Sequence, residues 1–289
     1  MTNPRPQLVT DVARLRRVLD GVRGRSKRIG LVPTMGALHE GHLSLVGAAR
    51  SECDYTVVSI FVNPSQFGPA EDYQQYPRTL EADLDALAEC GADLAFAPAA
   101  EEVYRPEHAT WVEVGSVAEP LEGRCRPGHF RGVATIVLKL FNMVGADAAY
   151  FGQKDYQQAA VIRRMAADLD VPIEIRVCPI VRHDDGLAMS SRNAYLSPPA
   201  RQRALVLWKS LQAAIELVAG GQRDSAAVIE RMRQIVATAE DARIDYIALV
   251  DPDTLEPVDE IRGRTLAALA VTIENTRLID NHLLQPPPD

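Results

Sequence analysis

The sequence has few of the features that mark secreted or membrane proteins. Its four cysteines, Cys53, Cys90, Cys125 and Cys178, lie far apart, and none belongs to a C-x-x-C pair. This spacing predicts neither a disulfide framework nor a zinc knuckle and favours reduced thiols. No apolar run approaches the roughly 18 residues of a membrane span, and the first residues have no apolar signal-peptide core. We therefore expect a soluble, cytoplasmic protein.

Basic residues are also too few for a protein that coats a polyanion. There are 31 lysines and arginines against 39 acidic residues, a net charge of −8. This balance argues against nucleic acid or an anionic membrane as partner, so any polyanion must be bound by a local site. The 289 residues, 47% of them hydrophobic, are enough for a large core and favour two domains.

The usual glycine-rich nucleotide fingerprints are missing, and another motif stands in their place. Segment 33–42 reads PTMGALHEGH and follows a short apolar run at 29–32, with His39 and His42 three residues apart. A turn from a strand into a helix presents backbone N–H groups and the positive end of the helix to an anion. Two histidines at this spacing share a helix face, with Cβ atoms roughly 5–6 Å apart. The motif predicts a phosphate site; a metal pair, or a capped helix start with two incidental histidines, is the alternative.

Apolar runs alternate with helix-period segments through about residue 181. The predicted strands are 29–32, 56–62, 94–97, 148–151 and 173–177, and the segments 79–90 and 136–144 have helical spacing between them. This alternation predicts an α/β fold with a mostly parallel, doubly wound sheet. Ligands are then expected at the carboxyl ends of the strands, where the histidine motif lies.

The pattern changes after residue 181. A polar loop at 182–186 precedes helix-period segments at 198–219 and 224–238, and strand patterns return at 244–250, 266–273 and 276–284. We therefore predict two domains, 1–181 and 182–289, the second a smaller α+β domain with an antiparallel sheet.

Three further segments carry groups suited to substrate binding, each with a simpler alternative. In 151–158, Gly152 permits close approach, Lys154 offers a phosphate-binding charge, and Asp155 suits a ribose hydroxyl or a helix cap. In 189–193, two serines followed by Arg192 suit a phosphate clamp, or form an ordinary loop. In 61–67, the amides of Asn63 and Gln66 could bind a small acid without adding charge, or belong to a turn.

Two more groups are open to a structural interpretation. Arg126, His129 and Arg131 lie in a glycine-containing loop before a helix, where an acidic substrate and a purely structural role are equally compatible. The acidic group at 81–85, which includes Asp83, is interpreted as a solvated helix face in preference to a magnesium site. The loop at 69–76 is a candidate gate because of its polarity and prolines.

The motifs resemble one family when they are taken together. Segments 33–42, 61–67, 76–79, 152–158 and 185–193, in this order, resemble pantothenate synthetases, and the similarity runs from about residue 28 to 284. Two positions differ from commoner versions: Gln153 is often Glu, and Ser65 is often Met. Both differences concern details of the pocket and leave the reaction unaffected.

The resemblance implies a reaction and an architecture. The reaction is ATP-dependent condensation of (R)-pantoate with β-alanine through a pantoyl adenylate, releasing AMP and pyrophosphate. ATP is a substrate, and Mg²⁺ is expected mainly on its phosphates, so no protein metal ligand is named. The implied fold is a Rossmann-like, nucleotidyltransferase-type domain with a smaller C-terminal lid, usually in a homodimer.

The resemblance also implies roles for individual residues. His39 and His42 would hold the phosphates, His42 also being a possible proton donor, with Lys154 and Arg192 as the other catalytic groups. The implied ATP-binding set is Met35, Gly36, Ala37, Leu38, His39, Glu40, Gly41, His42, Gly152, Gln153, Lys154, Asp155, Val181, Met189, Ser190, Ser191 and Arg192. The implied pantoate and β-alanine set is Gln66, Gln158, Asn63, Tyr76 and His129.

Two other functions fit parts of this pattern. A nucleotidylyltransferase would share the two-histidine motif and the Ser-Ser-Arg loop, but its phosphorylated substrate calls for cations where Gln66 and Gln158 stand. A nucleotide sensor without turnover would not need groups that act on a transition state.

Overall fold

The computed structural model describes residues 4–69 and 71–287, and the chain forms two compact units. The first unit comprises the chain up to residue 153 together with 158–179, and the second comprises 154–157 together with the chain from residue 180. The predicted gate, 69–76, includes residue 70, which lies outside the described residues. The division of binding roles between two domains remains a prediction.

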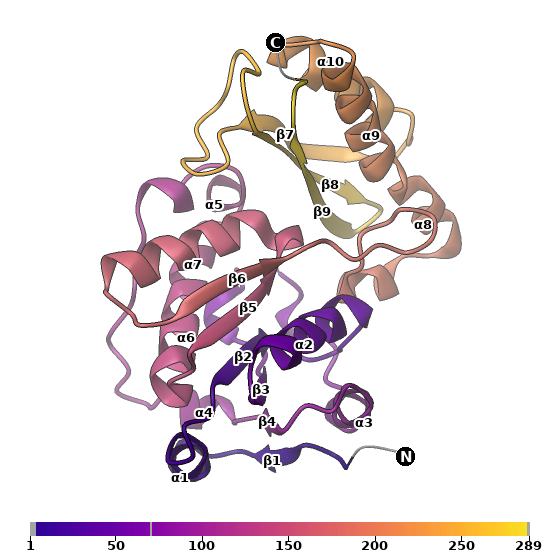
Figure 1. Cartoon of the computed structure of the whole chain (residues 1–289). Coiled ribbons are helices and arrows are strands. Elements are labelled where there is room, and N and C mark those ends of the chain that lie inside the picture. The colour runs from indigo at the N-terminus through magenta and orange to yellow at the C-terminus, as the bar shows by residue number, and fades with distance from the viewer. Residues whose placement is uncertain (1–3, 70, 288–289) are drawn as a thin grey trace. The chain divides into compact units, whose positions relative to one another are not determined.

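The first unit is built on a six-stranded parallel sheet (Figure 1). Its strand order is β1-β4-β3-β2-β5-β6, and each neighbouring pair is parallel. The strands are β1 (Gln7–Val9), β2 (Ile29–Thr34), β3 (Tyr55–Ile60), β4 (Leu94–Phe96), β5 (Ala148–Gly152) and β6 (Glu174–Cys178). The predicted α/β class is therefore confirmed.

One strand of this sheet was not predicted. β1 has three residues and lies at the edge, where Leu8 pairs with Ala95 of β4. Three residues are too few to show a period-2 pattern, so only pairing with β4 identifies them as a strand.

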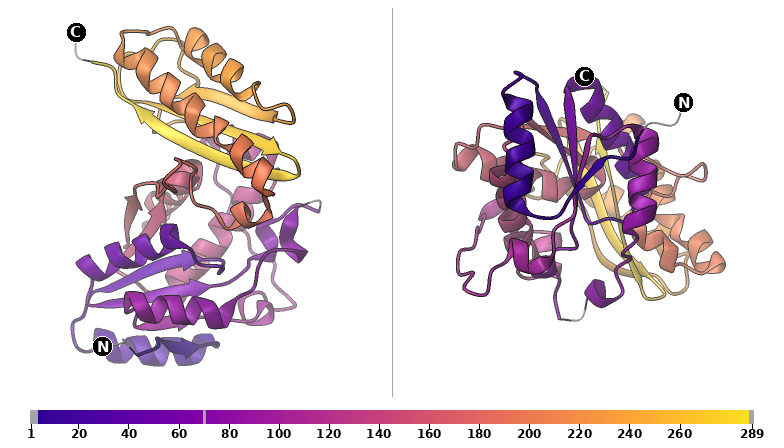
Figure 2. Two further views of the ribbon diagram at one scale, coloured as in Figure 1. Left: turned by 90° about the vertical axis from the view of Figure 1, so that its right-hand side faces the viewer. Right: turned by 90° about the horizontal axis from the view of Figure 1, so that it is seen from below.

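Helices cover both sides of this sheet (Figure 2). They are α1 (Val12–Arg23), α2 (Glu40–Glu52), α3 (Leu80–Cys90), α4 (Ala100–Val103), α5 (Glu122–Cys125), α6 (His129–Val144) and α7 (Tyr156–Asp168). On one face, Val46 of α2 and Leu87 of α3 pack with Val32 and Val58 of the central strands. The predicted helical segments at 79–90 and 136–144 correspond to α3 and to the second half of α6.

The strand order defines a switch point between β2 and β5. From β2 the chain proceeds to β3 and β4 on one side, and it later returns to β5 on the other side of β2. In such sheets, ligands bind at the carboxyl ends of the strands on either side of the reversal. The histidine motif follows β2 and Gly152 ends β5, so both motifs begin at this point.

The second unit contains a three-stranded antiparallel sheet, β7-β8-β9, and three helices. The strands are β7 (Arg243–Val250), β8 (Thr265–Ile273) and β9 (Thr276–Leu284), and the helices are α8 (Pro198–Ala204), α9 (Val206–Ala219) and α10 (Ser225–Val236). Leu211 of α9 and Met232 of α10 pack with Leu269 of β8 in one core.

The prediction of a single helix at 198–219 was wrong. α8 ends at Ala204 and α9 begins at Val206, and the backbone N–H of the intervening Leu205 donates to the carbonyl of Gln202, three residues earlier. Its φ of −62° and ψ of −15° are close to those of a tight 3₁₀ turn, which helix-period spacing does not distinguish from a continuous helix.

None of the helices in the described part of the chain is long and apolar enough to cross a membrane.

Candidate active site

The turn between β2 and α2 is held in shape by two buried side chains. The Thr34 hydroxyl donates to the Ser59 carbonyl (2.7 Å) and accepts from the Gly36 N–H (3.2 Å). The Asp83 carboxylate accepts from the Ala37 N–H (3.1 Å) and the Leu38 N–H (2.8 Å). The backbone N–H groups of Gly36, Ala37 and Leu38, which the motif was expected to present to an anion, are therefore already paired within the protein.

The interpretation of the acidic group as a solvated helix face is wrong for Asp83, whereas Glu81 and Asp85 are exposed as expected. The exposed fraction of Asp83 is only 2%, and it stabilises a turn in which Gly36 and Ala37 both have positive φ, 83° and 51°. A Cβ at position 36 would lie 3.0 Å from the Asp83 carboxylate, so the turn requires glycine there. Sequence spacing could not identify this role, because Asp83 acts 45 residues away from the backbone that it binds.

The two histidines of the motif lie side by side at the start of α2. Their ring centroids are 4.0 Å apart, and both residues are half-buried. His39 is the N-cap, and its backbone N–H donates to Nδ1 of His42 (3.4 Å). This hydrogen bond requires a lone pair on Nδ1, so the neutral His42 ring carries its proton on Nε2. The contact at Nδ1 thus holds the His42 ring in one orientation at the start of α2.

The amides after β3 form a second group, in the first unit. Asn63 is 1% exposed, and its Nδ2 donates to the Gly132 carbonyl (3.2 Å) and to Oε1 of Gln66 (3.1 Å). Its Oδ1 accepts from the hydroxyls of Ser65 and Tyr104, each at 2.9 Å. The side chain of Asn63 thus uses all its usual hydrogen bonds inside the protein, which makes it an anchor for Gln66.

Gln66 joins this group to the histidine motif. Its Nε2 lies 3.1 Å from the sulfur of Met35, in the turn after β2. Ser65 takes part because it carries a hydroxyl, which a methionine at this position would not supply. The helix α6 comes so close that a Cβ on Gly132 would lie 2.2 Å from the Ser65 carbonyl oxygen. Gln66 is therefore positioned by tertiary contacts on two sides.

A chain of charged and polar groups also leads to Gln66. Arg126 binds Glu71 with two hydrogen bonds (2.8 and 2.6 Å), and its third nitrogen lies 3.1 Å from Nε2 of His129. Nδ1 of His129 lies 2.9 Å from the Gln66 carbonyl. Because Arg126 only donates, Nε2 accepts, and the proton of the ring is on Nδ1. Both ring nitrogens are therefore already used within the protein.

Burial and charge explain the protonation states in this chain. Burial and the neighbouring Arg126 cation lower the pKa of His129 to about 4, so the ring is neutral near pH 7. For Glu71, burial works in the opposite direction, but the ion pair with Arg126 outweighs it and lowers the pKa of the carboxyl. Tyr76, in the segment that follows Glu71, is 6% exposed and packs edge-on against Phe67 at 6.0 Å.

The second unit positions the other predicted phosphate-binding groups. Nζ of Lys154 lies 3.7 Å from the Asp155 carboxylate, and the Lys154 carbonyl accepts from Nδ2 of Asn281 (2.8 Å). In the polar loop, the Met189 N–H donates to the Val181 carbonyl (3.0 Å). Ser190 caps a 3₁₀ turn, η5 (Ser191–Tyr195), by accepting from the Arg192 N–H (3.3 Å).

Two residues of β9 support this unit and were missed in the sequence. Asp280, which is 3% exposed, binds both terminal nitrogens of Arg182 (2.6 and 2.9 Å). Its neighbour Asn281 holds the backbone of Lys154. Burial raises the pKa of the Asp280 carboxyl in spite of Arg182. Two adjacent polar residues inside an apolar strand pattern were the only available signal.

Three further predicted site residues lie on α7, at the end of β5 and in the turn that follows β5. Gln158 is half-buried on α7 in the first unit, Gly152 is half-buried at the end of β5, and Gln153 lies in the following 3₁₀ turn, η4 (Gln153–Asp155). A Cβ on Gly152 would meet no atom within 4 Å, so close packing against protein does not explain this glycine.

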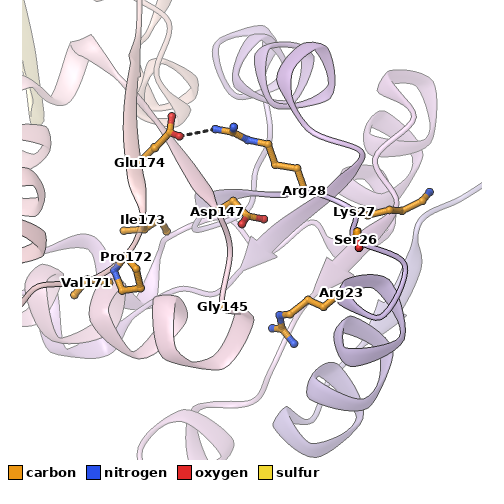
Figure 3. Close-up of a pocket in the computed structure, with 10 residues that line it drawn as sticks. All are labelled: Arg23, Ser26, Lys27, Arg28, Gly145, Asp147, Val171, Pro172, Ile173 and Glu174. Carbon is orange, nitrogen blue, oxygen red and sulfur yellow. Dashed lines mark ion pairs between the residues drawn. The ribbon is translucent and has the colours of Figure 1, made fainter.

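A cavity of about 860 Å³ lies at the opposite end of the parallel sheet, away from the histidine motif (Figure 3). Arg28 and Asp147, which immediately precede β2 and β5, line it, as does Glu174 at the start of β6. Its position at the amino ends of the strands separates it from the switch point, so we do not assign the active site to it.

Comparisons with known proteins identify the family of this chain. A family model described as pantoate-beta-alanine ligase matches residues 7–283. The pantothenate synthetase of Moorella thermoacetica is 53% identical over 279 residues, which cover 96% of this chain and 99% of the relative. The chain therefore belongs to the pantoate-beta-alanine ligase family, and it is a ligase that forms a carbon–nitrogen bond.

Solved structures show the same fold. The pantothenate synthetase of Thermus thermophilus superimposes with a TM-score of 0.93 at 46% identity, covering 97% of this chain and 100% of that one. A pantoate-beta-alanine ligase from Francisella tularensis, described as complexed with beta-gamma ATP and β-alanine, gives a TM-score of 0.80 at 33% identity. That comparison covers 96% of this chain and 97% of the other.

Proposed function

We propose that this enzyme condenses (R)-pantoate with β-alanine at the expense of ATP, through a pantoyl adenylate. The observation that carries the proposal is the position of Gln66, a neutral amide held between Asn63 and the turn that bears His39 and His42. A carboxylic acid bound by Gln66 would therefore lie next to the turn whose two histidines are suited to binding phosphate. The Francisella relative, described with a nucleotide and β-alanine, supports the same pair of substrates.

The chemistry explains why an adenylate is needed. At neutral pH an amine and a carboxylate form an unreactive ion pair. In the first step a pantoate carboxylate oxygen attacks the α-phosphorus of ATP, and the bond to the β,γ-diphosphate breaks, releasing pyrophosphate. In the second step the β-alanine amine attacks the acyl carbon, and the bond to AMP breaks as the amine loses a proton. No protein nucleophile takes part, so catalysis consists of orientation and charge stabilisation.

In this proposal the histidine pair stabilises the charge that builds on the departing pyrophosphate. His42, whose neutral ring carries its proton on Nε2, is the direct donor. Lys154, Ser190, Ser191 and Arg192 complete the set around the phosphates. Gly152, Asp155 and the backbones of Met35 and Val181 border the nucleoside.

The acid side of the proposal rests on neutral groups. Gln66 and Gln158 would orient pantoate, and Tyr76 would line that pocket. Asn63 and His129 would act mainly by positioning Gln66, because their polar atoms are engaged in the structure. A nucleotidylyltransferase would need a cation to bind its phosphorylated substrate. The guanidinium of Arg126, which contacts His129, is already neutralised by Glu71.

Magnesium fits this proposal as a partner of the nucleotide. No cluster of three or more His, Cys, Asp or Glu side chains in the described residues forms a ready metal site. A magnesium ion would therefore be held chiefly by phosphate oxygens, where it neutralises charge. We further propose a homodimer in the cytoplasm, with the second unit acting as a lid; these assignments follow from family membership.

Pyrophosphate exchange tests the order of the two steps. With ATP and pantoate alone, labelled pyrophosphate should enter ATP, whereas AMP and amide should appear only after β-alanine is added. A strict requirement of β-alanine for exchange would contradict the two-step mechanism. Exchange with a phosphorylated acid in place of pantoate would instead indicate a nucleotidylyltransferase.

A further inference from the structure

A second cavity of the first unit is lined by three cationic side chains and two carboxylates, none of them among the candidate active-site residues. It measures about 440 Å³ and is lined by α1, α4, the segment 105–110 and α6. Met143 and Val103 give it apolar walls, and its polar groups are Arg16, Arg105, His108, Lys139, Glu102, Glu107 and Thr110.

The cations of this cavity have no carboxylate partners. In residues 4–69 and 71–287, no acidic oxygen lies within ion-pair distance of Arg16, Arg105 or Lys139. Glu102 instead uses one carboxylate oxygen to accept from the backbone N–H of Val12 (2.8 Å). Burial and the nearby Arg105 charge lower the pKa of Lys139, as expected for a cation without a counter-ion.

A buried imidazole nitrogen beside these cations also lacks a partner. Nε2 of His108 is buried and makes no hydrogen bond within the described part of the chain. The ring is fixed edge-on against Tyr104 and Trp111, with centroids 5.0 and 5.1 Å away. Nζ of Lys139 lies 5.5 Å from the centre of the same Tyr104 ring. A buried polar atom without a partner is costly, so a ligand that accepts a hydrogen bond would stabilise this arrangement.

The cavity at the amino ends of the strands provides a contrast (Figure 3). There Arg28 lies 3.0 Å from Glu174, and Arg23 lies 2.7 Å from Asp20. The Asp147 carboxylate accepts from the Ile29 N–H at 2.7 Å. Two guanidinium groups there are thus paired with carboxylates, whereas Arg105 and Lys139 of the second cavity form no ion pair in the described part of the chain, although Glu102 and Glu107 line the same cavity.

We propose that the cavity beside Lys139 binds a phosphate group, either inorganic phosphate or the phosphate of a small monoester. Lys139 from α6 and Arg105 from the loop supply charge, and His108 donates from Nε2. These groups come from different elements, and a tetrahedral phosphate presents oxygens in all directions, whereas a carboxylate presents two in one plane. The Tyr104 ring lies against both Lys139 and His108 and carries the hydroxyl that donates to Asn63, so the ligand would lie one side chain away from the substrate amides.

Trp111 allows the site to be observed directly, without an activity measurement. The chain has two tryptophans, so Trp208→Phe leaves Trp111, beside His108, as the only tryptophan emitter. Phosphate is titrated into this full-length variant at constant ionic strength. We expect a saturable change in Trp111 emission, weakened roughly ten- to a hundredfold by Lys139→Gln and by Arg105→Gln, as for the loss of a hydrogen bond to a charged group.

Matched variants separate this site from others. Lys27→Gln removes an exposed lysine that lines the other cavity and should leave the response unchanged (Figure 3). Lys154→Ala should leave it unchanged as well, which excludes phosphate binding at the proposed nucleotide site. Glycerol phosphate is compared with inorganic phosphate: tighter binding of the monoester identifies an organic phosphate as ligand, and equal or weaker binding identifies free phosphate.

Two results would overturn the proposal. One is the absence of a saturable emission change up to the solubility limit of phosphate. The other is a saturable change that neither Lys139→Gln nor Arg105→Gln weakens, provided that both variants retain the far-ultraviolet circular dichroism of the parent.

Discussion

The two ends of the parallel sheet are both rich in polar groups, but they use them differently. At the amino end, carboxylates of Asp54, Asp93 and Asp147 accept from the backbone N–H groups of Arg28, Thr56 and Ile29. At the carboxyl end, the Asp83 carboxylate holds a turn, and two histidines and an amide are directed by fixed neighbours. Both ends therefore have aspartates that complete the fold, but only the carboxyl end adds His42 and Gln66, whose side chains are held in place by their neighbours.

This comparison explains why polarity alone does not locate a site. The first N–H groups of a strand need acceptors, and aspartate side chains supply them where β2 and β3 begin. A site needs groups whose orientation is imposed by other residues, as the orientation of Gln66 is by Asn63 and His129. The predictions below test this distinction between the two ends.

The largest effect is expected from removing a side chain that is proposed to bind the phosphates of ATP. His42→Ala or Lys154→Ala should lower turnover by roughly 10²–10³-fold, or about 2.7–4 kcal/mol, the usual effect of losing one preorganised donor. Steady-state kinetics with saturating substrates measures it, with Lys209→Ala, an exposed lysine of α9, as control. A variant that melts early and keeps its turnover would show that its residue is structural.

A pH effect of similar size is expected from His129. Its pKa of about 4 in the folded protein lies below the ordinary value of 6.5, so the unfolded chain binds more protons between these pH values. The stability contributed is complete above pH 6.5 and is lost as the pH falls through about 4, in total roughly 3 kcal/mol.

Urea unfolding of the parent and of His129→Gln between pH 7 and pH 4 tests this expectation. The parent should lose more stability than the variant over this range, since only the parent contains the buried imidazole. Parallel pH curves for the two proteins would show that His129 does not titrate as expected.

A smaller effect on substrate use is expected from the glutamines. Gln66→Leu or Gln158→Leu should lower the specificity constant for pantoate by about ten- to a hundredfold and leave ATP affinity almost unchanged. Calorimetry with ATP alone, in the absence of pantoate, is the matched measurement. An equal loss of nucleotide affinity would place both glutamines in the nucleotide pocket.

The smallest effect is expected at the amino end of the sheet. Asp147→Ala removes the acceptor of the buried Ile29 N–H and should lower the free energy of unfolding by roughly 1–2 kcal/mol without changing the kinetic constants. Asp20→Ala removes only an exposed ion pair and should change stability by less than about 1 kcal/mol. A loss of turnover in Asp147→Ala would mean that the two ends do not differ as described.

Much of the fold followed from local patterns. The runs at 29–32 and 148–151 alternate with helical segments, and such runs form strands because each buries both faces beneath helices. The pattern did not identify β1, which has three residues, or the break at Leu205, where one tight turn separates two helices of similar spacing.

The candidate site was predictable only in part. The order of motifs pointed to His39, His42 and Gln66, because residues after a strand lie at the carboxyl edge of a parallel sheet. The supporting groups were not predictable: Asp83, Glu71 and Asp280 have sequence surroundings typical of exposed or strand residues. Each acts on atoms at least 45 residues away, and no local period contains that information.

The sequence by itself therefore determined the α/β class, the family and the positions of the chemical motifs, because these depend on short-range periodicity and on contiguous residues. Only the tertiary structure determined which polar groups already have hydrogen-bond partners in the protein and which are positioned to contact a ligand. That decision depends on contacts between distant segments, such as Arg126 with Glu71 and Tyr104 with Asn63. It also depends on burial, which makes His129 neutral and lowers the pKa of Lys139.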